Sequence, residues 1–210
     1  VVTIRGYTEM ILKERLGPIT PQQKKGLEVA LRNINKLIGM INSIVNYSKL
    51  DSAELQSSIE RVLIREFVDE VCKGVSSALK LKPVQLHVNN TVKEDVYLSV
   101  DRAKLIRAFC NIIDNSIKFS NIGSKIVWHL SIKENKLINK IEDNGVGISE
   151  EHVNAVFEDF FQVRSQHTGP PGLGLGLSYA KKVIEMHKGK IHLESRLGSG
   201  TVVLIELPLN

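Results

Sequence analysis

Residues 101–120 read DRAKLIRAFCNIIDNSIKFS, and the interpretation of the fold starts from this stretch. Apolar side chains cover most of its circumference when it is read as a helix, which predicts a buried helix. These side chains are Leu105, Ile106, Phe109, Ile112, Ile113 and Ile117. Yet Asn111, Asn115 and Lys118 recur at i, i+4 and i+7, so they share one stripe of that helix. A polar stripe on a buried helix needs partners, because burying unpaired polar groups is costly.

The stripe carries groups that suit a metal-bound triphosphate. The carbonyl oxygen of an Asn side chain is a hard ligand for Mg²⁺, and a Lys ammonium is a point charge for phosphate. The alternative is a half-exposed helix whose stripe merely faces water. The stripe alone leaves both interpretations open.

The segments around this helix alternate between helix and strand patterns. Residues 134–135 and 197–200 are short turns between strand patterns, so the sheet contains antiparallel pairs. We expect an α+β fold in which helices cover one face of the sheet, with Asp101 as an N-cap. The expected helices are 65–79, 101–119, 150–157 and 175–187, and the expected strands are 84–88, 96–100, 125–132, 137–142, 190–195 and 201–207.

The N-terminal part has a different pattern and predicts a helical hairpin. A first helix spans residues 3–16, and the Gly-Pro pair at 17–18 ends it. Thr20 then serves as N-cap, Pro21 occupies the first helical position, and Gln23 completes a capping box. A second helix therefore begins at this point.

The second helix carries a heptad seam. The seam consists of Leu27, Leu31, Ile34, Ile38, Ile41, Val45 and Ser48. A lone hairpin cannot bury both of its faces, so we expect two copies to dimerise into a four-helix bundle. The alternative is a hairpin packed on the globular domain of its own chain. Residues 51–60 look like a polar connector, and we assign the hairpin to 1–54 and the globular domain to 55–210.

A second candidate site follows the strand pattern at 137–142. Asp143 shares the inner face of that strand, and Gly145 and Gly147 in the next turn allow a close approach of backbone to a ligand. A buried Asp needs a donor, and the amino group of adenine is one. The alternative is a plain Asp-Asn-Gly hairpin turn.

Glycines open the helix expected at 175–187. Residues 172–177 read GLGLGL, and the free amides and positive dipole end at a helix start suit phosphate. This is not a Walker loop, because no Gly-Lys-Ser/Thr follows. It is not the dinucleotide fingerprint either, because the third glycine comes one residue early and no strand directly precedes it. The alternative is a flexible loop whose glycines serve packing.

An aromatic segment lies between these two motifs. Residues 157–161 read FEDFF in a chain with only 5% aromatic residues, and the stretch 164–171 that follows is polar. We expect a lid over a nucleotide, anchored by the phenylalanines. The alternative is a small hydrophobic cluster under a loop.

Composition narrows the class of ligand. A net charge of +5 suits a polyanion such as a triphosphate, while scattered Lys and Arg with few aromatics argue against nucleic acid. Cys72 and Cys110 lie far apart in helical patterns, so we expect reduced, buried thiols. No apolar run reaches the roughly 18 residues of a membrane-spanning helix.

The order of the motifs is more specific than any one of them. In sequence they are Asn111-x-x-x-Asn115-x-x-Lys118-Phe119, Asp143-x-Gly145-x-Gly147, Phe157-x-x-Phe160-Phe161 and Gly172-x-Gly174-x-Gly176. This series resembles the N, G1, F and G2 boxes of sensor histidine kinases. These kinases belong to a wider superfamily with gyrase, heat-shock chaperone and mismatch-repair ATPases. The resemblance covers nearly the whole chain.

The resemblance implies a fold, cofactors and residue roles. The fold is a two-layer α/β sandwich of the Bergerat type with a mixed sheet, which binds ATP with Mg²⁺ beneath a lid. Asn115 looks like the Mg²⁺ ligand, Asp143 like the adenine reader, and Asn111 and Lys118 like catalytic groups beside the phosphates. The implied ATP contacts are Asn111, Asn115, Lys118, Phe119, Asp143, Gly145, Gly147, Phe161, Gly172, Leu173, Gly174, Leu175, Gly176 and Thr201.

One position separates the kinases from the ATPases of the superfamily. The ATPase branches typically carry Glu, the base that activates water, four residues before the Mg²⁺-binding Asn. Here that residue is Asn111, and an amide cannot accept the proton. We therefore expect negligible steady-state hydrolysis of ATP.

Two positions depart from the kinase pattern. None of the six histidines is followed by an acidic residue, as in the His-Glu/Asp-x-Arg/Lys-x-Pro acceptor box, and all lie outside the hairpin. Either the sequence begins just after that box or the protein lacks it, so we expect no autophosphorylation by this chain alone. Gln162 stands where many relatives carry Arg, with Arg164 two positions on.

The resemblance implies a histidine protein kinase of a two-component system, which passes the γ-phosphoryl group of ATP to a histidine and then to the Asp of a response-regulator receiver domain. The alternative is a nucleotide-binding dimerisation module, a pseudokinase without phosphotransfer. Asn111 disfavours the ATPase branch, and the heptad hairpin disfavours a serine-directed kinase. We expect a cytoplasmic location, with any membrane anchor in segments absent from this sequence.

Overall fold

The computed structural model describes residues 1–48, 50, 58–92, 95–163 and 173–209. The chain divides into two compact units, Val1–Lys49 and Leu50–Asn210, and each is described here by itself. The domain boundary expected at 54/55 lies outside the described residues.

The first unit is a pair of helices that pack against each other, α1 (Val2–Leu12) and α2 (Pro21–Ser48). The capping box predicted at the start of α2 is confirmed. The Thr20 amide donates to Gln23 Oε1 at 2.8 Å, and the Gln23 amide donates to Thr20 Oγ1 at 3.2 Å. These reciprocal bonds satisfy amides that the first helical turn leaves without partners.

Helix α1 ends four residues before the predicted end at residue 16, which corrects that boundary. The Arg15 amide donates to Met10 O at 3.0 Å and the Glu14 amide to Ile11 O at 2.9 Å. Glu14 adopts φ 56° between them. This is a Schellman motif, and its left-handed residue is normally glycine. No local signal marks this helix end, because a glutamate occupies the position where glycine is usual.

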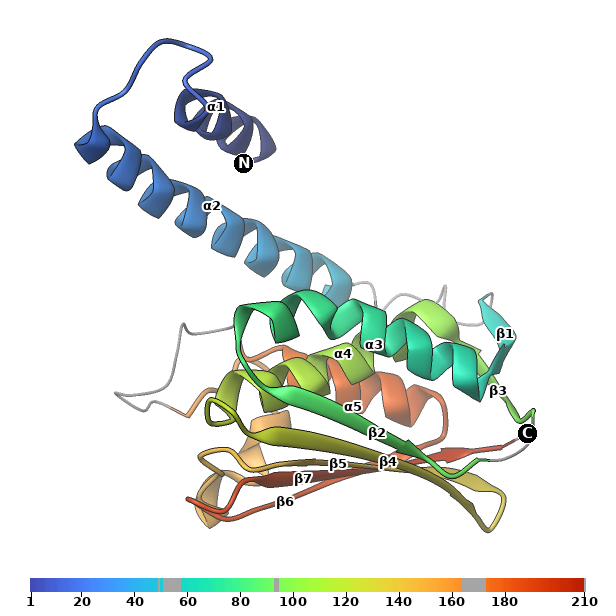
Figure 1. The fold of residues 1–210 in the computed structure, drawn as a ribbon. Helices are drawn as coiled ribbons and strands as arrows, with labels where there is room; N and C mark the ends of the chain where they lie inside the picture. Colours follow the sequence, from blue (N-terminus) through green and yellow to red (C-terminus); the bar gives the residue numbers. More distant parts are fainter. Residues whose placement is uncertain (49, 51–57, 93–94, 164–172, 210) are drawn as a thin grey trace. The chain divides into compact units, whose positions relative to one another are not determined.

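The second unit has two layers, as predicted. A five-stranded sheet runs in the order β2-β4-β5-β7-β6, and helices α3, α4 and α5 lie on one face of it (Figure 1). The β2–β4 pair is parallel and the other pairs are antiparallel, so the sheet is mixed. The strands are β2 (Gln85–Asn90), β4 (Lys125–Lys133), β5 (Lys136–Asp143), β6 (Lys190–Ser195) and β7 (Thr201–Pro208), and the helices are α3 (Ile64–Leu81), α4 (Arg102–Phe119) and α5 (Gly176–Met186).

Two elements differ from the prediction. Strand β1 (Ile59–Leu63) forms a separate antiparallel ribbon with β3 (Tyr97–Asp101), although part of it was assigned to the polar connector. The helix expected at 150–157 is instead two 3₁₀ turns, Glu150–His152 and Ala155–Phe157. Such short turns are common connectors and do not develop a continuous helical face.

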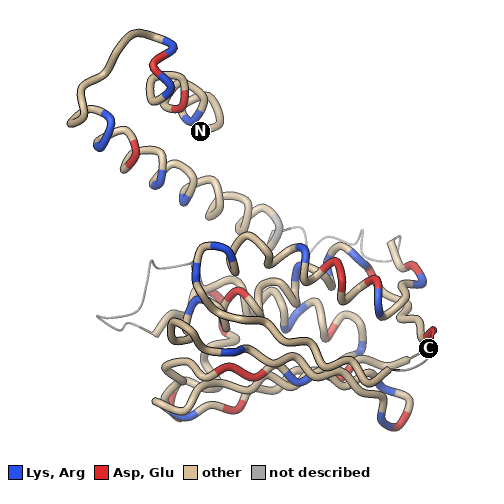
Figure 2. The backbone as a smooth tube through the Cα atoms, in the orientation of Figure 1, with Lys and Arg blue, Asp and Glu red and all other residues tan. Residues whose placement is uncertain are grey.

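The core lies between the helices and the sheet. Phe67, Phe109 and Trp128 are fully buried there, and the Phe67 and Phe109 rings meet edge to face at 5.0 Å. The Trp128 indole donates to Asn139 Oδ1 at 3.1 Å, which pairs two buried polar groups on neighbouring strands. Outside the core, basic and acidic residues interleave along the helices and strands (Figure 2).

Both cysteines are free, as expected, but each is half-buried and not fully buried. Burial, with a smaller contribution from Asp114, raises the pKa of Cys110 to about 11, so this thiol stays protonated near neutral pH. In the part of the chain that the structure describes, no helix combines the length and apolar character needed to cross a bilayer.

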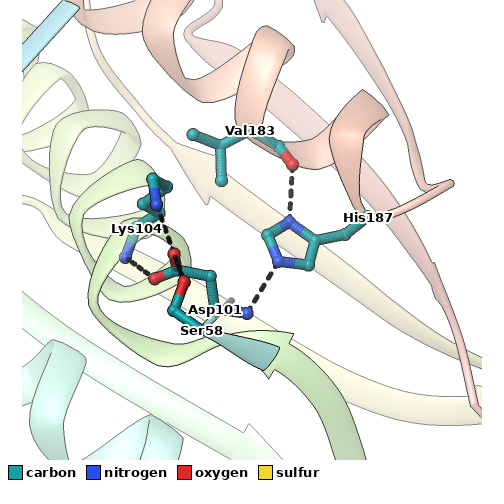
Figure 3. A network of polar contacts seen from close by, with 5 residues as sticks. All are labelled: Ser58, Asp101, Lys104, Val183 and His187. Atoms are coloured by element: carbon teal, nitrogen blue, oxygen red, sulfur yellow. Dashed lines mark hydrogen bonds and ion pairs between the residues drawn. The ribbon is translucent and has the colours of Figure 1, made fainter. Parts of the chain in front are cut away.

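A polar network joins the start of α4 to the end of α5 (Figure 3). Asp101 is the N-cap of α4, as predicted, and its carboxyl accepts from the Lys104 amide at 3.0 Å and from the side chains of Lys104 and Ser58. The Asp101 amide donates to His187 Nε2 at 2.9 Å, and His187 Nδ1 lies 2.7 Å from Val183 O. Since Nε2 accepts, Nδ1 carries the proton.

Candidate functional site

Helix α4 buries one face, and the predicted stripe lies on the same helix. Seven of its residues are buried: Leu105, Ala108, Phe109, Ile112, Ile113, Ser116 and Ile117. Asn111, Asn115 and Lys118 are half-buried. The stripe is therefore partly covered by neighbouring residues.

The start of α5 lies against this stripe. Asn111 Nδ2 donates to the main-chain oxygen of Gly176 at 3.3 Å. A Cβ atom placed on Gly176 would lie 3.7 Å from Asn111 Cβ and 3.9 Å from Asn115 Nδ2. Asn111, Asn115 and the glycine-opened helix are thus brought together, although 65 residues separate Asn111 from Gly176 in sequence.

The first amides of α5 are not covered by a capping side chain. Leu175 is the N-cap, it is buried, and among the described residues no side chain caps the helix. The first amides of an uncapped helix are free to bind an anion, and the helix dipole favours negative charge there. This end of α5 can therefore bind a phosphate next to Asn111 and Asn115.

Asn115 and Lys118 present different groups. Among the described residues, no hydrogen bond to the Asn115 side chain is found, so its carbonyl oxygen is available to a ligand. Lys118 Nζ lies 4.8 Å from the centre of the Phe119 ring, and the Lys118 main-chain oxygen accepts from Lys82 Nζ at 2.7 Å. A cation beside the last carbonyls of a helix is favoured by the helix dipole.

Asp143 ends strand β5 and is buried beneath α4. The Gly145 amide donates to Asp143 Oδ1 at 2.9 Å. Burial raises the pKa of the Asp143 carboxyl, while hydrogen bonds from Gly145, the Ser116 side chain and the Thr201 main chain partly oppose that rise. Ser116 comes from α4, and Thr201 is paired with Asp143 across β5 and β7. The carboxyl therefore lies where three elements meet.

The glycines of this turn make close contacts with protein backbone. A Cβ atom on Gly145 would lie 2.6 Å from Phe119 O, and one on Gly147 would lie 2.0 Å from Arg196 O. Gly147 also adopts φ +68°. The sequence predicted that these glycines let a ligand come close to the backbone. In the structure they also let the backbone come close to Phe119 and Arg196. A side chain at either position would push the turn away from its neighbours.

The same turn is joined to the end of α4. The Val146 amide donates to Phe119 O at 3.2 Å, and Gly145 forms an isolated antiparallel bridge with Ser120. Lys118 and Phe119 are thereby fixed near Asp143, so the N-box helix and the turn after β5 form one cluster.

The aromatic segment packs against the glycine-rich one. A Cβ atom on Gly174 would lie 2.5 Å from Phe161 O, and Gly174 adopts φ +72°. Phe161 is half-buried beside His152, with ring centres 5.5 Å apart, whereas Phe160 is 61% exposed at φ 63°. Leu173 is half-buried. The predicted lid at 164–171, with Arg164, and the site residue Gly172 lie outside the described residues.

Three residues of the cluster were not predicted. Ser116 binds Asp143, Ser120 bridges to Gly145, and Lys82 binds the end of α4. The two serines lie one helical turn apart, and the spacing of Ser116 from Asn111 and Asn115 places it off the polar stripe. Small serines in an apolar helix resemble core residues, so only the strand that packs beneath them reveals their role.

No group of three or more His, Cys, Asp or Glu side chains in the described parts of the chain can hold a metal ion. A metal at this cluster would therefore depend on ligands from a bound nucleotide together with an amide oxygen. Mg²⁺ is commonly held in this way, by few protein ligands and by substrate phosphates.

Comparison with known proteins identifies the family of this chain. Residues 100–210 match the family model described as histidine kinase-, DNA gyrase B- and HSP90-like ATPase. Sensor protein SrrB of Staphylococcus aureus strain N315 is 32% identical over 209 residues, which is 98% of this chain and 35% of SrrB. The chain thus spans about a third of the length of this relative.

Solved structures show the same fold. The catalytic domain of histidine kinase ThkA matches with a TM-score of 0.61 and 26% identity, covering 72% of this chain and 95% of that domain. Histidine kinase ThkA in complex with response regulator protein TrrA matches with a TM-score of 0.71 and 22% identity, covering 100% of this chain and 57% of that one. The family model spans all four ordered motifs and more than half of the sequence. The chain therefore belongs to the family of histidine kinase-, DNA gyrase B- and HSP90-like ATPases and is a homologue of sensor histidine kinases.

Proposed function

We propose that this chain is the ATP-binding catalytic region of a sensor histidine kinase. Its reaction transfers the γ-phosphoryl group of ATP to a histidine, for relay to an aspartate of a response regulator. The observation that carries the proposal is the contact between the α4 stripe and the start of α5, where Asn111 binds the Gly176 main chain. This contact supports the proposal because it joins an amide side chain of the stripe to the uncapped start of α5, where a phosphate can bind.

Asp143 is the group that reads the base. A carboxylate oxygen accepts from the exocyclic amino group of adenine, while the Gly145 amide holds Oδ1 in place at 2.9 Å. The keto group of guanine at the same position offers no such donor. Because the carboxyl is buried, a mismatched base would leave it unpaired, and that penalty favours adenine.

The phosphates are bound by the first amides of α5 and by Lys118. Asn115 would hold Mg²⁺ through its side-chain oxygen, which fits because no protein donor in the described residues occupies it. When bound, the ion supplies charge neutralisation between the phosphate oxygens. Gly174 and Gly176 lie at the start of α5, and we propose that they serve as the hinge of the lid.

Catalysis then rests on positioning. Asn111 uses its Nδ2 group to hold Gly176, and an amide cannot act as the base that would activate water. Hydrolysis is therefore slow, and the γ-phosphoryl group is kept for a histidine presented in line. The acceptor is not expected within this chain, because no histidine here has the acceptor-box pattern.

Titration with a non-hydrolysable ATP analogue and Mg²⁺ tests the proposal. We expect heat of binding and a thermal shift that both fall strongly in Asn115→Ala, together with negligible steady-state release of phosphate. Rapid turnover that is lost in Asn111→Ala would contradict the kinase assignment. A protein that includes the native residues before Val1 should acquire acid-labile, base-stable label from ATP, and the absence of any label would favour a nucleotide-binding module without phosphotransfer.

The partners follow from the same proposal. The ThkA relative was solved with a response regulator, and we propose a receiver domain as the partner of this chain. A second copy is the proposed partner of the hairpin, and the proposed location is the cytoplasm.

A further inference from the structure

Ser120 is a buried residue at the end of α4 to which neither the motifs nor the proposed reaction assigns a role. It is the C-cap of the helix, with φ −67° and ψ 154°, and its amide donates to Ser116 O at 3.0 Å. Its side chain is only 4% exposed. The backbone here is extended, so Ser120 leaves the helix and forms its bridge with Gly145.

The hydroxyl of Ser120 is left without a partner. Ser120 Oγ is inaccessible to solvent, and among the described residues no hydrogen-bond partner reaches it. Burying an unpaired hydroxyl destabilises a protein, and an alanine in the same place would avoid that cost. An unsatisfied buried group in a folded protein therefore points to a partner that binds there.

The surroundings of Ser120 identify the class of that partner. Gly145, which bridges to Ser120, is the residue whose amide holds Asp143 Oδ1. Ser116, one turn earlier on α4, hydrogen bonds to the same carboxyl through its side chain. The unpaired hydroxyl thus belongs to a residue whose main chain pairs with the turn that holds the Asp143 carboxyl.

We infer that the Ser120 hydroxyl is a second nucleobase-binding group, which becomes accessible when a nucleotide binds and then contacts the edge of adenine directly or through one ordered water. The inference rests on the proposed function. A hydroxyl both donates and accepts, so it can pair with a ring nitrogen or with the amino group. Asp143 only accepts while it is ionised, so the two groups together read a donor and an acceptor on one base edge.

The rival explanation is a structural water that occupies the site whether or not a nucleotide is bound. The two explanations differ in what the hydroxyl does for the free protein. A structural water would make Ser120→Ala less stable without nucleotide. A base-binding hydroxyl predicts that Ser120→Ala without nucleotide is as stable as the native protein or more stable, because an unpaired polar group has been removed.

The experiment uses the full chain and three variants, Ser120→Ala, Ser120→Thr and the control Ser76→Ala, whose hydroxyl bonds to Lys73 O on α3. Calorimetry measures the Kd of a non-hydrolysable ATP analogue and of tripolyphosphate, each with Mg²⁺, and thermal melts follow the free proteins. We expect Ser120→Ala to weaken the ATP analogue about five- to tenfold and leave tripolyphosphate unchanged. Ser120→Thr, which keeps the hydroxyl, should recover most of the loss, and Ser76→Ala should bind like the native chain.

Three results would overturn the inference while leaving the proposed function intact. They are an unchanged Kd in Ser120→Ala, an equal loss toward tripolyphosphate, and a lower melting temperature of the free variant with an unchanged Kd. Absence of nucleotide binding by the native chain would overturn the proposed function and this inference together. This outcome is distinguishable from the three above because it is seen in the native chain, without any variant.

Discussion

Burial of the Asp143 carboxyl has a cost to folding that the proposed nucleotide binding would offset. Burial raises the pKa of its carboxyl, so the folded protein holds the proton more tightly than the unfolded chain does. The free energy of unfolding therefore falls as pH rises from the unfolded pKa of about 3.9 through the higher pKa of the folded state. The charged form, which we propose binds adenine, is the form that destabilises the free protein.

We accordingly predict that Asp143→Asn separates stability from binding. The Asn side chain does not titrate. The stability of the variant relative to the native protein should therefore improve as pH rises from the unfolded to the folded pKa of Asp143, and then level off. Nucleotide affinity should fall by on the order of tenfold or more, since a charge-assisted bond is lost. Urea unfolding across pH 4 to 8 and calorimetry measure the two effects. A variant less stable than the native protein at neutral pH would contradict the assignment of burial as the dominant cause.

The sequence predicted the polar stripe but not all of its surroundings. Asn111, Asn115 and Lys118 stand out because large polar residues interrupt an apolar helix at regular spacing. Ser116 and Ser120 did not stand out, because a buried hydroxyl is recognised only from the atoms around it. Those atoms belong to the β5 turn, which no local pattern in the helix predicts.

At the scale of elements, the turn between β6 and β7 offers a matched pair of glycines. Gly198 and Gly200 adopt φ +80° and +85°, so a side chain strains both positions. Only Gly200 is closely packed, because a Cβ atom there would lie 2.0 Å from Asp143 O, whereas nothing lies within 4 Å of one on Gly198. An added side chain would therefore clash with the backbone of the site at Gly200 but would meet open space at Gly198.

We predict that Gly198→Ala costs about 1 to 2 kcal/mol of stability, the cost of a left-handed residue. Gly200→Ala should cost about 3 kcal/mol or more, because overpacking adds to the same strain. Chemical denaturation of the two variants measures the difference. Nucleotide affinity should fall only in Gly200→Ala, and equal losses of stability would show that Gly200 does not pack against Asp143 in solution.

The polar network at the start of α4 leads to the opposite pH dependence of stability. Burial alone would raise the pKa of Asp101, but hydrogen bonds from Lys104 and Ser58 outweigh it and the pKa is lowered. The stabilisation from Asp101 is therefore present above the unfolded pKa of about 3.9 and is lost as pH falls through the lower pKa of the folded state.

Asp101→Ala should cost roughly 1 to 2 kcal/mol near neutral pH, as the loss of an N-cap does. Asp101→Asn is the matched control, since it keeps a capping oxygen and should lose less. The deficit of both variants should shrink in acid, when the native carboxyl is itself protonated. Guanidinium unfolding at pH 7 and pH 3 measures it, and a deficit that is the same at both values would argue against a charged cap.

Elements with strong local signals were predicted well, and those that depend on distant partners were not. The capping box of α2, the N-cap of α4 and the β4–β5 hairpin are each encoded within a few neighbouring residues. Strand β1 was missed because its pairing partner, β3, lies more than thirty residues away, and its polar outer residues resemble a connector. The composition of 150–157 favours a helix, which is why the sequence predicts one there. The structure instead forms two 3₁₀ turns of three residues each.

At the scale of the whole molecule, we assign nucleotide binding and dimerisation to different units. Every described residue assigned to nucleotide binding lies in the unit Leu50–Asn210. Helix α2 exposes the seam residues Ile41 at 40% and Val45 at 44%, and also Leu37 and Ile44, both at 48%, beside the seam. A surface of this kind is covered when helices of two chains pack together along a heptad seam.

We therefore predict that the full chain is a dimer, and that residues 58–210 alone are a folded monomer with the same nucleotide affinity per chain. Ile41→Glu combined with Val45→Glu should shift the full chain to the monomer, because charges at seam positions cannot be buried without partners. Light scattering after size exclusion measures the mass, and calorimetry the Kd.

Lys36→Glu is the control, since it adds an acidic charge to α2 at a residue outside the seam and should leave the dimer intact. A native chain that stays monomeric at tens of micromolar would instead favour a hairpin that buries its seam within its own chain, and a loss of affinity in 58–210 would show that the first unit contributes to nucleotide binding.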